Sequence, residues 1–370
     1  MTTLVIPDLL KPNDGRFGSG PSKVPASALE VFAGAGAAIM GTSHRQAPVK
    51  DLVRRIRSGL AELFQLPEDY EIILGNGGST ALWDAMAFGL VRTRAQHVVC
   101  GEFSKKFAEV TAGAPFLQAP AIVGVEPGSG TIPVFDPDVD VYAWPQNETS
   151  TGVALPVQRV IDAAEALMVI DATSAAGGME VDITQTDVYY FAPQKAFASD
   201  GGLWFAACSP AALARIEEIH LADRWIPPSL DLHVAVENSR KEQTYNTPAL
   251  ATLLLMEQQL NWMRDIGGVA EAAGRSAESS SRIYEWAAKS DYAEPFVQDP
   301  QWRSPVVVTV DLNGVEGTQI INVLRQNGIV DIDPYRALGR NQLRIGVYPA
   351  VDPDDVSALL SCIDWVTERL

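Results

Sequence analysis

The sequence predicts an α/β protein with a second, smaller α+β domain at its C-terminal end, and two features of the chain lead to this prediction. Up to about residue 265, short apolar runs typical of buried strands alternate with segments whose apolar residues recur at three and four positions. Beyond residue 266 the order changes to helix 269–288, strand 306–311, helix 317–327, strand 342–348 and helix 354–370. We therefore expect an N-terminal arm over 1–15, a large domain over 16–265 and a small domain over 266–370.

The elements of the large domain follow from the same patterns. Leu52, Ile56 and Leu60 lie on one face of an expected helix that ends before Pro67. The expected helices are 26–38, 49–64, 81–91, a helix ending near 112, 155–167, 210–222 and 249–263, the last with Pro248 close to its first turn. The expected strands are 71–74, 97–100, 139–144, 167–170, the apolar run that begins at 188, and 201–208. Residues 1–15 are rich in proline and glycine, which predicts an extended arm rather than a packed element.

Charge and cysteine content limit the possible functions. The net charge of −18 and the absence of a block rich in Lys and Arg argue against a nucleic-acid surface. The N-terminus carries no basic leader, and no stretch approaches the roughly 18 apolar residues of a membrane span, so we expect neither a secretory signal nor a membrane segment. Cys100, Cys208 and Cys362 are widely spaced in apolar surroundings. They predict free thiols in a reducing cytoplasm and no disulfide or metal site.

The apolar run over 188–197 contains a lysine, Lys195, at the expected end of a strand. Burial lowers the pKa of an amine and makes it a nucleophile toward aldehydes, which is how proteins hold pyridoxal phosphate covalently. The preceding strand ends on Asp171, and a buried carboxylate needs a cationic partner such as a protonated pyridine nitrogen. The alternatives are a lysine that caps its strand and reaches water, and a direct Asp171–Lys195 ion pair.

Other polar groups follow the same set of strands. The glycine-rich turn 75–80 joins a strand to a helix and carries Ser79 and Thr80, which suits a phosphate, although such turns also serve as tight bends. Phe103 follows the strand at 97–100, where an aromatic ring could stack on a flat ligand or belong to the core. A polar loop at 145–152 follows the strand at 139–144.

Basic residues occur at two places where an anion could bind. His44 and Arg45 are adjacent in a polar loop, where they either clamp an anion or remain solvated. Arg336, Arg340 and Arg344 form an expected basic patch in the small domain, and Arg344 lies within a strand, as suits bidentate binding of a carboxylate.

Taken together, these motifs have the chain order of a fold-type I pyridoxal-phosphate enzyme. The sequence resembles the phosphoserine aminotransferases of the class V aminotransferase group along essentially its whole length. The resemblance lies in residues 17–22, 43–45, 77–80, 147–149, 171–174, 194–195 and 246–248. It implies an aspartate-aminotransferase-like fold with a mostly parallel, seven-stranded sheet flanked by helices.

The resemblance also implies a role for each matching residue. Lys195 would bind the cofactor covalently and shuttle the substrate's α-proton, and Asp171 would keep the pyridine nitrogen protonated. Phe103 would stack on the ring, at a position where relatives often have tryptophan. The remaining cofactor contacts would come from Ser79, Thr80, Thr149, Gln194, Asn246 and Thr247. Many relatives have Ala-Arg in place of Ser79-Thr80, so other donors must replace that arginine.

The same resemblance implies a homodimer with shared active sites, in which Asn246 and Thr247 reach the partner subunit's cofactor. Arg344 would bind the substrate's α-carboxylate. His44 and Arg45, with Arg336 from the neighbouring subunit, would bind the second anion of phosphoserine or glutamate. Some relatives have His-Arg where this chain has Tyr335-Arg336.

The implied reaction is the reversible exchange of an amino group between glutamate and 3-phosphohydroxypyruvate in serine biosynthesis, with the four-carbon analogue in pyridoxine synthesis as a further substrate. Alternatives are an alanine–glyoxylate or serine–pyruvate aminotransferase, a cysteine desulfurase, which needs a cysteine on a mobile loop, and a non-catalytic protein that kept the fold.

Overall fold

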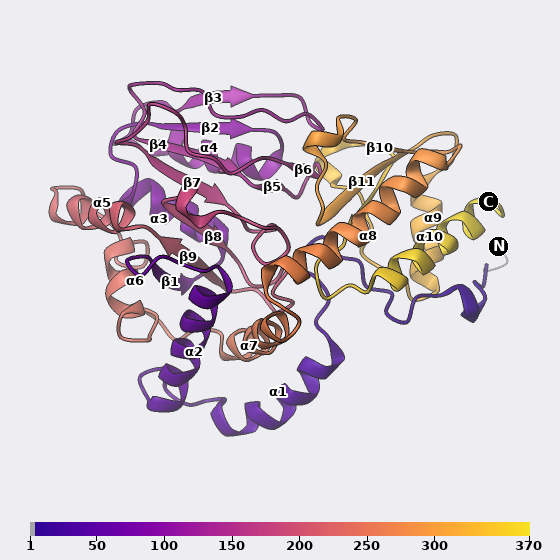
Figure 1. Ribbon diagram of the computed structural model, residues 1–370, viewed down its shortest axis with the longest axis horizontal. Helices are drawn as coiled ribbons and strands as arrows, with labels where there is room; N and C mark the ends of the chain where they lie inside the picture. Colours follow the sequence, from indigo (N-terminus) through magenta and orange to yellow (C-terminus); the bar gives the residue numbers. More distant parts are fainter. Residues whose placement is uncertain (1–3) are drawn as a thin grey trace.

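A seven-stranded sheet forms the centre of the computed structural model, which describes residues 4–370 (Figure 1). The strand order is β1-β9-β8-β7-β4-β2-β3. Neighbours from β3 to β8 are parallel, whereas β9 is antiparallel to both β8 and β1. The predicted α/β architecture with a mostly parallel sheet is therefore confirmed.

The strands of this sheet are short, as is usual for buried parallel strands. They are β1 (Glu71–Asn76), β2 (Ala95–Val99), β3 (Ala121–Gly124), β4 (Val141–Pro145), β7 (Leu167–Asp171), β8 (Val188–Phe191) and β9 (Leu203–Cys208). A two-stranded hairpin of β5 (Asn147–Glu148) and β6 (Val153–Ala154) follows β4.

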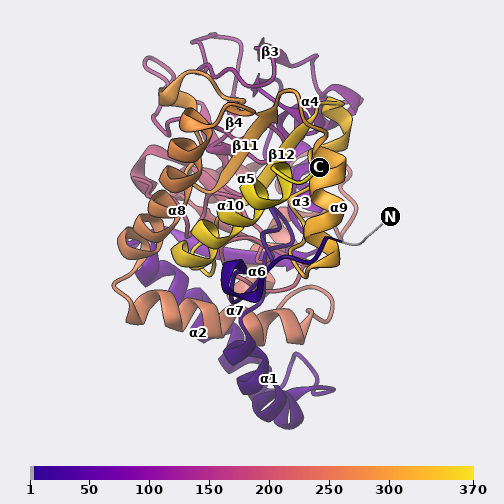
Figure 2. The ribbon, with the colours of Figure 1, turned by 90° about the vertical axis from the view of Figure 1, so that its right-hand side faces the viewer.

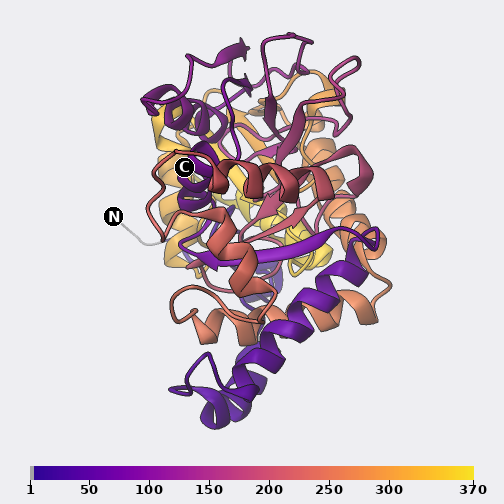
Figure 3. The same cartoon turned by 90° about the vertical axis from the view of Figure 1, so that its left-hand side faces the viewer.

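Helices cover both faces of the sheet because successive strand residues point to opposite sides. Ile72 and Leu74 pack into one hydrophobic cluster with α2 (Ala47–Leu63) and α7 (Leu250–Asp265), whereas Ile73 packs into another. The second cluster includes α3 (Ser79–Gly89), α4 (Glu102–Gly113), α5 (Pro210–Leu221) and α6 (Leu232–Ser239). Figure 3 shows α5 and α6 on this side, and α1 (Ala26–Ile39) extending from the lower end of the molecule.

A three-stranded antiparallel sheet of β10 (Ala293–Pro295), β11 (Val307–Leu312) and β12 (Gln342–Gly346) forms the second unit. Its helices are α8 (Val269–Lys289), α9 (Gly317–Gln326) and α10 (Pro353–Thr367), and Figure 2 views the molecule from this end. Within residues 4–370 there are also four short 3-10 helices: η1 (Asp8–Leu10), η2 (Ile183–Gln185), η3 (Pro300–Trp302) and η4 (Arg336–Leu338). The small C-terminal sheet with its helices agrees with the predicted α+β region. The domain boundary near residue 265 stays a prediction.

The N-terminal segment is packed, contrary to the expectation of an unpacked arm. Within the described part of the expected arm, Ile6 is fully buried in the hydrophobic cluster of the small sheet, and the backbone N–H of Asn13 donates to the Asp355 carboxylate at 2.7 Å. Because apolar side chains flank the proline-rich part, burial fixes this segment in spite of its composition.

Other differences from the predicted elements have local causes. The expected helix at 155–167 is absent, since the segment contains Pro156, Asp162 takes a positive φ of 68°, and the strand β7 already begins at Leu167. Helix α7 begins at Leu250 with Ala249 as its N-cap, so Pro248 lies just before the helix. The elements β3, β10 and α6 and the β5–β6 hairpin were not predicted, because they are short and their patterns are weak.

Two further findings concern the whole described chain. Over residues 4–370, the helices are all too short or too polar to cross a membrane. Cys100, Cys208 and Cys362 are buried and unpaired, as predicted.

Candidate active site

A cavity of about 300 Å³ lies at the carboxyl edge of the large sheet. Parallel strands place their carboxyl ends along the same edge, so residues far apart in sequence meet there. Seven of the nine predicted cofactor residues line this cavity: Ser79, Thr80, Phe103, Thr149, Asp171, Gln194 and Lys195. The fold therefore brings together most of the predicted cofactor site within one chain.

The amine of Lys195 is buried and donates a hydrogen bond to the carbonyl oxygen of Ser19 at 2.7 Å. Burial, reinforced by the nearby Arg344 guanidinium, lowers the pKa of this amine to about 7. A large fraction of the amine is then neutral near pH 7, as a nucleophile requires. Lys195 does not reach into solvent as a strand cap would. No ion pair joins it to Asp171 among residues 4–370.

Asp171 ends β7 and lies directly opposite Tyr190 of the parallel strand β8. Its carboxylate accepts a hydrogen bond from the backbone N–H of Thr173 at 2.9 Å. Burial raises the pKa of this carboxyl, and the hydrogen bonds from Thr173 and Tyr190 partly oppose that effect. In the described chain Asp171 has no cationic partner within ion-pair distance, so a cationic group in the cavity would stabilise it.

The glycine-rich turn leads directly into helix α3. Gly77 and Gly78 have φ values of +117° and +95°, which favour glycine, and Gly78 is an N-cap without a side-chain hydrogen bond. The first backbone N–H groups of α3 therefore lack a capping side chain, and residues 77–80 line the cavity. Ser79 is buried and its hydroxyl bonds that of Thr173 at 2.7 Å, whereas Thr80 is exposed. This geometry suits an anion such as a phosphate.

Phe103 lies in the first turn of α4, and a buried carboxylate holds that turn in place. Glu148 accepts hydrogen bonds from the backbone N–H of Ser104 at 2.9 Å and that of Phe103 at 3.3 Å, and from the Ser150 hydroxyl at 2.7 Å. Glu148 thereby caps the positive end of α4. The Phe103 ring lines the cavity and is only partly buried, so it is available to a flat ligand.

Polar groups of the β5 loop also face the cavity. The Thr149 hydroxyl and the Asn147 amide both donate to the Ser174 hydroxyl at 2.8 Å. The side-chain oxygens of Asn147 and Gln194 are buried without a hydrogen-bond partner among the described residues. Buried polar atoms are normally satisfied, which indicates that a ligand completes this site.

Arg344 on β12 of the small sheet does not line the cavity itself but contacts Thr149, which does. One of its terminal nitrogens donates to the Thr149 carbonyl at 3.2 Å, and its Nε is buried without a partner in the described chain. Burial lowers the pKa of this guanidinium. The expected patch of three arginines is wrong, because Arg340 is paired with Asp311 at 2.5 Å. Arg336 is exposed on η4.

The remaining predicted residues form a separate cluster that does not line the Lys195 cavity. His44 is buried and its Nδ1 lies 3.3 Å from the Thr247 hydroxyl. Burial and the adjacent Arg45 lower the pKa of His44, and its Nε2 has no partner within residues 4–370. Arg45, Asn246 and Thr247 are exposed. A single chain therefore leaves this cluster outside the cavity.

Comparison with known proteins identifies the family. The family model "Aminotransferase class-V" matches residues 131–333. A Mycobacterium protein (strain KMS) is 60% identical over 371 residues, covering 100% of both chains. The phosphoserine aminotransferase of Rhodococcus jostii (strain RHA1) is 56% identical over 370 residues, covering 100% of this chain and 99% of the relative. The chain belongs to the phosphoserine aminotransferases of the class-V aminotransferase family.

The fold of this class-V aminotransferase agrees with solved structures of the group. The crystal structure of a phosphoserine aminotransferase from Cytophaga hutchinsonii matches with a TM-score of 0.87 over 95% of this chain and 99% of that one, at 22% identity. At that identity the match bears on the fold alone. It confirms the predicted fold-type I architecture.

Class-V aminotransferases use pyridoxal phosphate, and the cavity fits this cofactor. Lys195 provides an amine for the aldehyde, and Asp171 a buried carboxylate for the ring nitrogen. The uncapped start of α3 at Ser79 suits the phosphate, and the Phe103 ring suits the pyridine face. The unpaired amide oxygen of Gln194 indicates that a further polar group belongs in the cavity.

Several supporting residues of this class-V aminotransferase were not identified from the sequence. Trp83 lines the cavity, and its indole N–H donates to the Tyr190 hydroxyl at 2.7 Å. Tyr190 in turn hydrogen-bonds Asp171. The Glu148 carboxylate accepts a hydrogen bond from the backbone N–H of Phe103, and the Ser19 carbonyl accepts one from the Lys195 amine. The parallel register of β7 and β8 places Tyr190 opposite Asp171. In the sequence, nothing distinguishes Tyr190 from the other residues of the apolar run that contains it.

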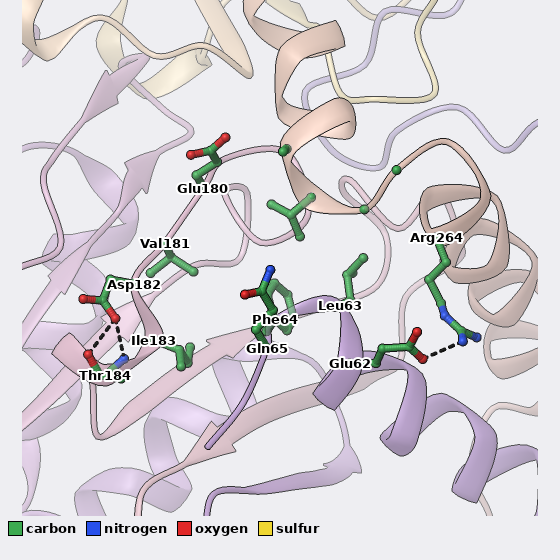
Figure 4. Close-up of a pocket in the computed structure, with 14 residues that line it drawn as sticks. Glu62, Leu63, Phe64, Gln65, Glu180, Val181, Asp182, Ile183, Thr184 and Arg264 are labelled. Atoms are coloured by element: carbon green, nitrogen blue, oxygen red, sulfur yellow. Dashed lines mark hydrogen bonds and ion pairs between the residues drawn. The ribbon is translucent and has the colours of Figure 1, made fainter. Parts of the chain in front are cut away.

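A larger cavity of about 560 Å³ lies elsewhere, between the end of α2 and the start of α8 (Figure 4). Figure 4 shows Glu62 paired with Arg264, and Asp182 bonded to Thr184. None of the predicted site residues lines it. The carboxylates of Glu62 and Asp182 already have these local partners, and the size of the cavity alone does not indicate a function.

Proposed function

We propose that this protein transfers the amino group of L-glutamate to 3-phosphohydroxypyruvate, giving O-phospho-L-serine and 2-oxoglutarate for serine biosynthesis. The observation that carries the proposal is the buried Lys195 amine, whose pKa is about 7, in one cavity with Asp171. The full-length similarity to a phosphoserine aminotransferase supports the choice of substrate.

Bound pyridoxal phosphate supplies an electron sink for the negative charge that develops at the substrate's α-carbon. Lys195 takes the proton from that carbon as a general base and returns it as a general acid, which a pKa near 7 favours in both directions. Asp171 holds the proton on the ring nitrogen. Phe103, fixed by Glu148 at the start of α4, orients the ring and excludes water from its face.

Substrate binding requires two anion sites, since phosphoserine and glutamate both carry an α-carboxylate and a second anion. The free Nε of Arg344 and the adjacent terminal nitrogen suit the α-carboxylate as a bidentate pair. We assign the second anion to His44, Arg45 and Arg336. The exposed guanidinium groups of Arg45 and Arg336 have no ion-pair partner among residues 4–370, which leaves them available to a substrate phosphate.

We propose a homodimer with shared active sites, because part of the predicted site lies outside the cavity of a single chain. Asn246 and Thr247 are exposed beside His44 rather than in the Lys195 cavity. Helix α1 extends from the body of the molecule in Figure 2 and exposes Leu29 and Val31, which are 46% and 47% accessible. Exposed apolar side chains of this kind are typical of subunit contacts.

Complementation between two inactive variants tests the shared sites. Mixed dimers of Lys195→Ala with an Asn246→Ala/Thr247→Ala variant contain one intact site if the site is shared. After unfolding and random reassociation, about a quarter of wild-type activity should return. No recovery, in a mixture shown to contain hybrid dimers, would place both sets of residues in the same subunit's site.

A substrate comparison tests the reaction. Turnover of 3-phosphohydroxypyruvate should exceed that of glyoxylate or pyruvate by at least about a hundredfold, because the two smaller oxo acids lack the second anion and lose its charge-assisted contacts. Equal rates would favour an alanine–glyoxylate or serine–pyruvate aminotransferase instead. The phosphorylated four-carbon analogue belongs in the same panel, since it carries the same two anions.

The cysteines bear on two other expectations. Burial raises the pKa of Cys100, Cys208 and Cys362, so none has the exposed, easily ionised thiol that a desulfurase needs. Three unpaired thiols support a reducing compartment, and we propose the cytoplasm.

A further inference from the structure

The Tyr335 ring contacts two side chains of the candidate site, Phe103 in helix α4 and Arg344 in strand β12. Its ring meets the Phe103 ring edge to face, with centroids 5.7 Å apart and an interplanar angle of 62°. The guanidinium carbon of Arg344 lies 5.2 Å from the centroid of the same ring. Phe103 belongs to α4 beside the large sheet, and Arg344 to β12 of the small sheet.

The two neighbours of Tyr335 are themselves fixed. The carboxylate of Glu148 holds the start of α4 and with it Phe103. The Thr149 carbonyl holds one terminal nitrogen of Arg344 at 3.2 Å, and the Nε of Arg344 remains without a partner in the described chain. The Tyr335 ring therefore covers one side of a half-buried cation whose free N–H groups are available to an incoming carboxylate.

The hydroxyl of Tyr335 makes no hydrogen bond within residues 4–370, so the contacts of this side chain are made by its ring. A face-on aromatic ring stabilises a guanidinium through its quadrupole and restricts the rotation of the side chain. Removing the ring would leave Arg344 with the Thr149 carbonyl as its one direct hydrogen-bond partner in the described chain.

We infer that Tyr335 is a positioning residue for substrate binding. Its ring holds the Arg344 guanidinium in the orientation that receives the substrate's α-carboxylate, and its hydroxyl does not bind the second anion. The inference rests on the proposed transamination and on the role proposed for Arg344. It assigns Tyr335 a function different from that of a histidine, which could donate a hydrogen bond to a phosphate.

The test compares Tyr335→Ala with Tyr335→Phe in the holoenzyme, using the half-reactions with L-glutamate and L-alanine. Alanine has one carboxylate, whereas glutamate has two. Loss of the ring should lower kcat/KM by the same factor for both amino acids, chiefly by raising KM. We expect this factor to be about 5 to 30, the range that a desolvated cation–π contact contributes. Tyr335→Phe keeps the ring and should stay within about twofold of wild type.

Phe296→Ala is the matched control, because its ring lies 4.7 Å from the guanidinium carbon of Arg340, which pairs with Asp311 away from the cavity. This variant should leave both half-reactions unchanged. Thermal unfolding of all three variants shows whether a loss of rate reflects a loss of structure.

Three results would overturn the inference: a Tyr335→Phe variant as impaired as Tyr335→Ala, a loss confined to glutamate, or wild-type kinetics in Tyr335→Ala. Binding of glutarate, an inert dicarboxylate, gives a readout that does not depend on turnover. Calorimetry should show weaker binding in Tyr335→Ala and unchanged binding in Tyr335→Phe. A wild-type protein that binds glutarate but does not transaminate would refute the proposed function and leave this binding test decisive for Tyr335.

Discussion

The amine of Lys195 donates a hydrogen bond to the carbonyl of Ser19 at 2.7 Å, across 176 residues of sequence. The Tyr348 hydroxyl donates to the same carbonyl, also at 2.7 Å. The N-terminal segment thus supplies the acceptor that orients the proposed catalytic amine. Because the next residue, Gly20, has a φ of +141° and lies against Lys195, this contact depends on the absence of a side chain there.

Gly20→Ala should displace Lys195 from this position. A methyl group at residue 20 would overlap the Lys195 amine and its side-chain carbons, and the backbone conformation is strained for alanine. We expect the affinity of the apoprotein for pyridoxal phosphate to fall at least about tenfold, the loss of one charge-assisted hydrogen bond or more. Quenching of tryptophan fluorescence during titration of the apoprotein with pyridoxal phosphate measures this affinity.

Gly268→Ala is the control for backbone strain alone. Gly268 also has a positive φ, +85°, but no heavy atom lies within 4 Å of the added methyl group. This variant should lose some stability and retain cofactor affinity. If both variants lose affinity equally, strain rather than the contact with Lys195 is responsible.

The depressed pKa of Lys195 should make the stability of the apoprotein depend on pH. Above pH 10.5 the amine is neutral in both states, and between pH 10.5 and about 7 the unfolded chain binds a proton that the folded protein does not. The buried lysine therefore destabilises the protein progressively as the pH falls through this range. Lys195→Met should be more stable than wild type at pH 7, by up to about 4 kcal/mol, with a smaller difference at pH 10.

Denaturant unfolding of both apoproteins across that range measures the difference. A constant difference from pH 7 to 10 would mean that the amine keeps its ordinary pKa in the folded protein.

Tyr190→Phe should affect both neighbours of the lost hydroxyl. The indole N–H of Trp83 would lose its 2.7 Å acceptor, and an unsatisfied buried donor costs about 1–3 kcal/mol. The pKa of Asp171 should rise further, since the Tyr190 hydrogen bond lowers it. Thermal unfolding of Tyr190→Phe, Trp83→Phe and the double variant forms a cycle. We expect the double variant to be less destabilised than the sum of the single variants, and strict additivity would rule out the coupling.

Arg45→Ala should raise the KM for phosphoserine at least about tenfold, because a charge-assisted pair contributes roughly 1.5–3 kcal/mol. Arg54→Ala is a suitable comparison, since Arg54 is an exposed arginine nearby in sequence that already pairs with Asp51 at 2.8 Å. Initial rates over a range of phosphoserine concentrations give the KM of each of the two variants. An unchanged KM in Arg45→Ala would remove this residue from the substrate site.

The alternation of strands and helices, and the polar residues at the strand ends, can be recognised from the sequence alone. Lys195, Asp171, Phe103 and the turn at Ser79 could be identified because apolar runs stop abruptly beside them, and a buried charge or a glycine-rich turn needs a chemical reason. The parallel sheet then brought these positions to one edge, as strand direction requires.

Contacts between distant segments could not be predicted in this way, because they form only when the chain is folded. The Ser19 carbonyl at Lys195, the Tyr190 hydroxyl at Asp171 and the Tyr335 ring at Arg344 depend on register and packing, which leave no periodic signal in the sequence. The segment 1–15 was expected to be an unpacked arm, yet Ile6 is buried in the hydrophobic cluster of the small sheet and Asn13 bonds Asp355. Local composition sets which residues can form an element, whereas non-local burial decides which of them meet.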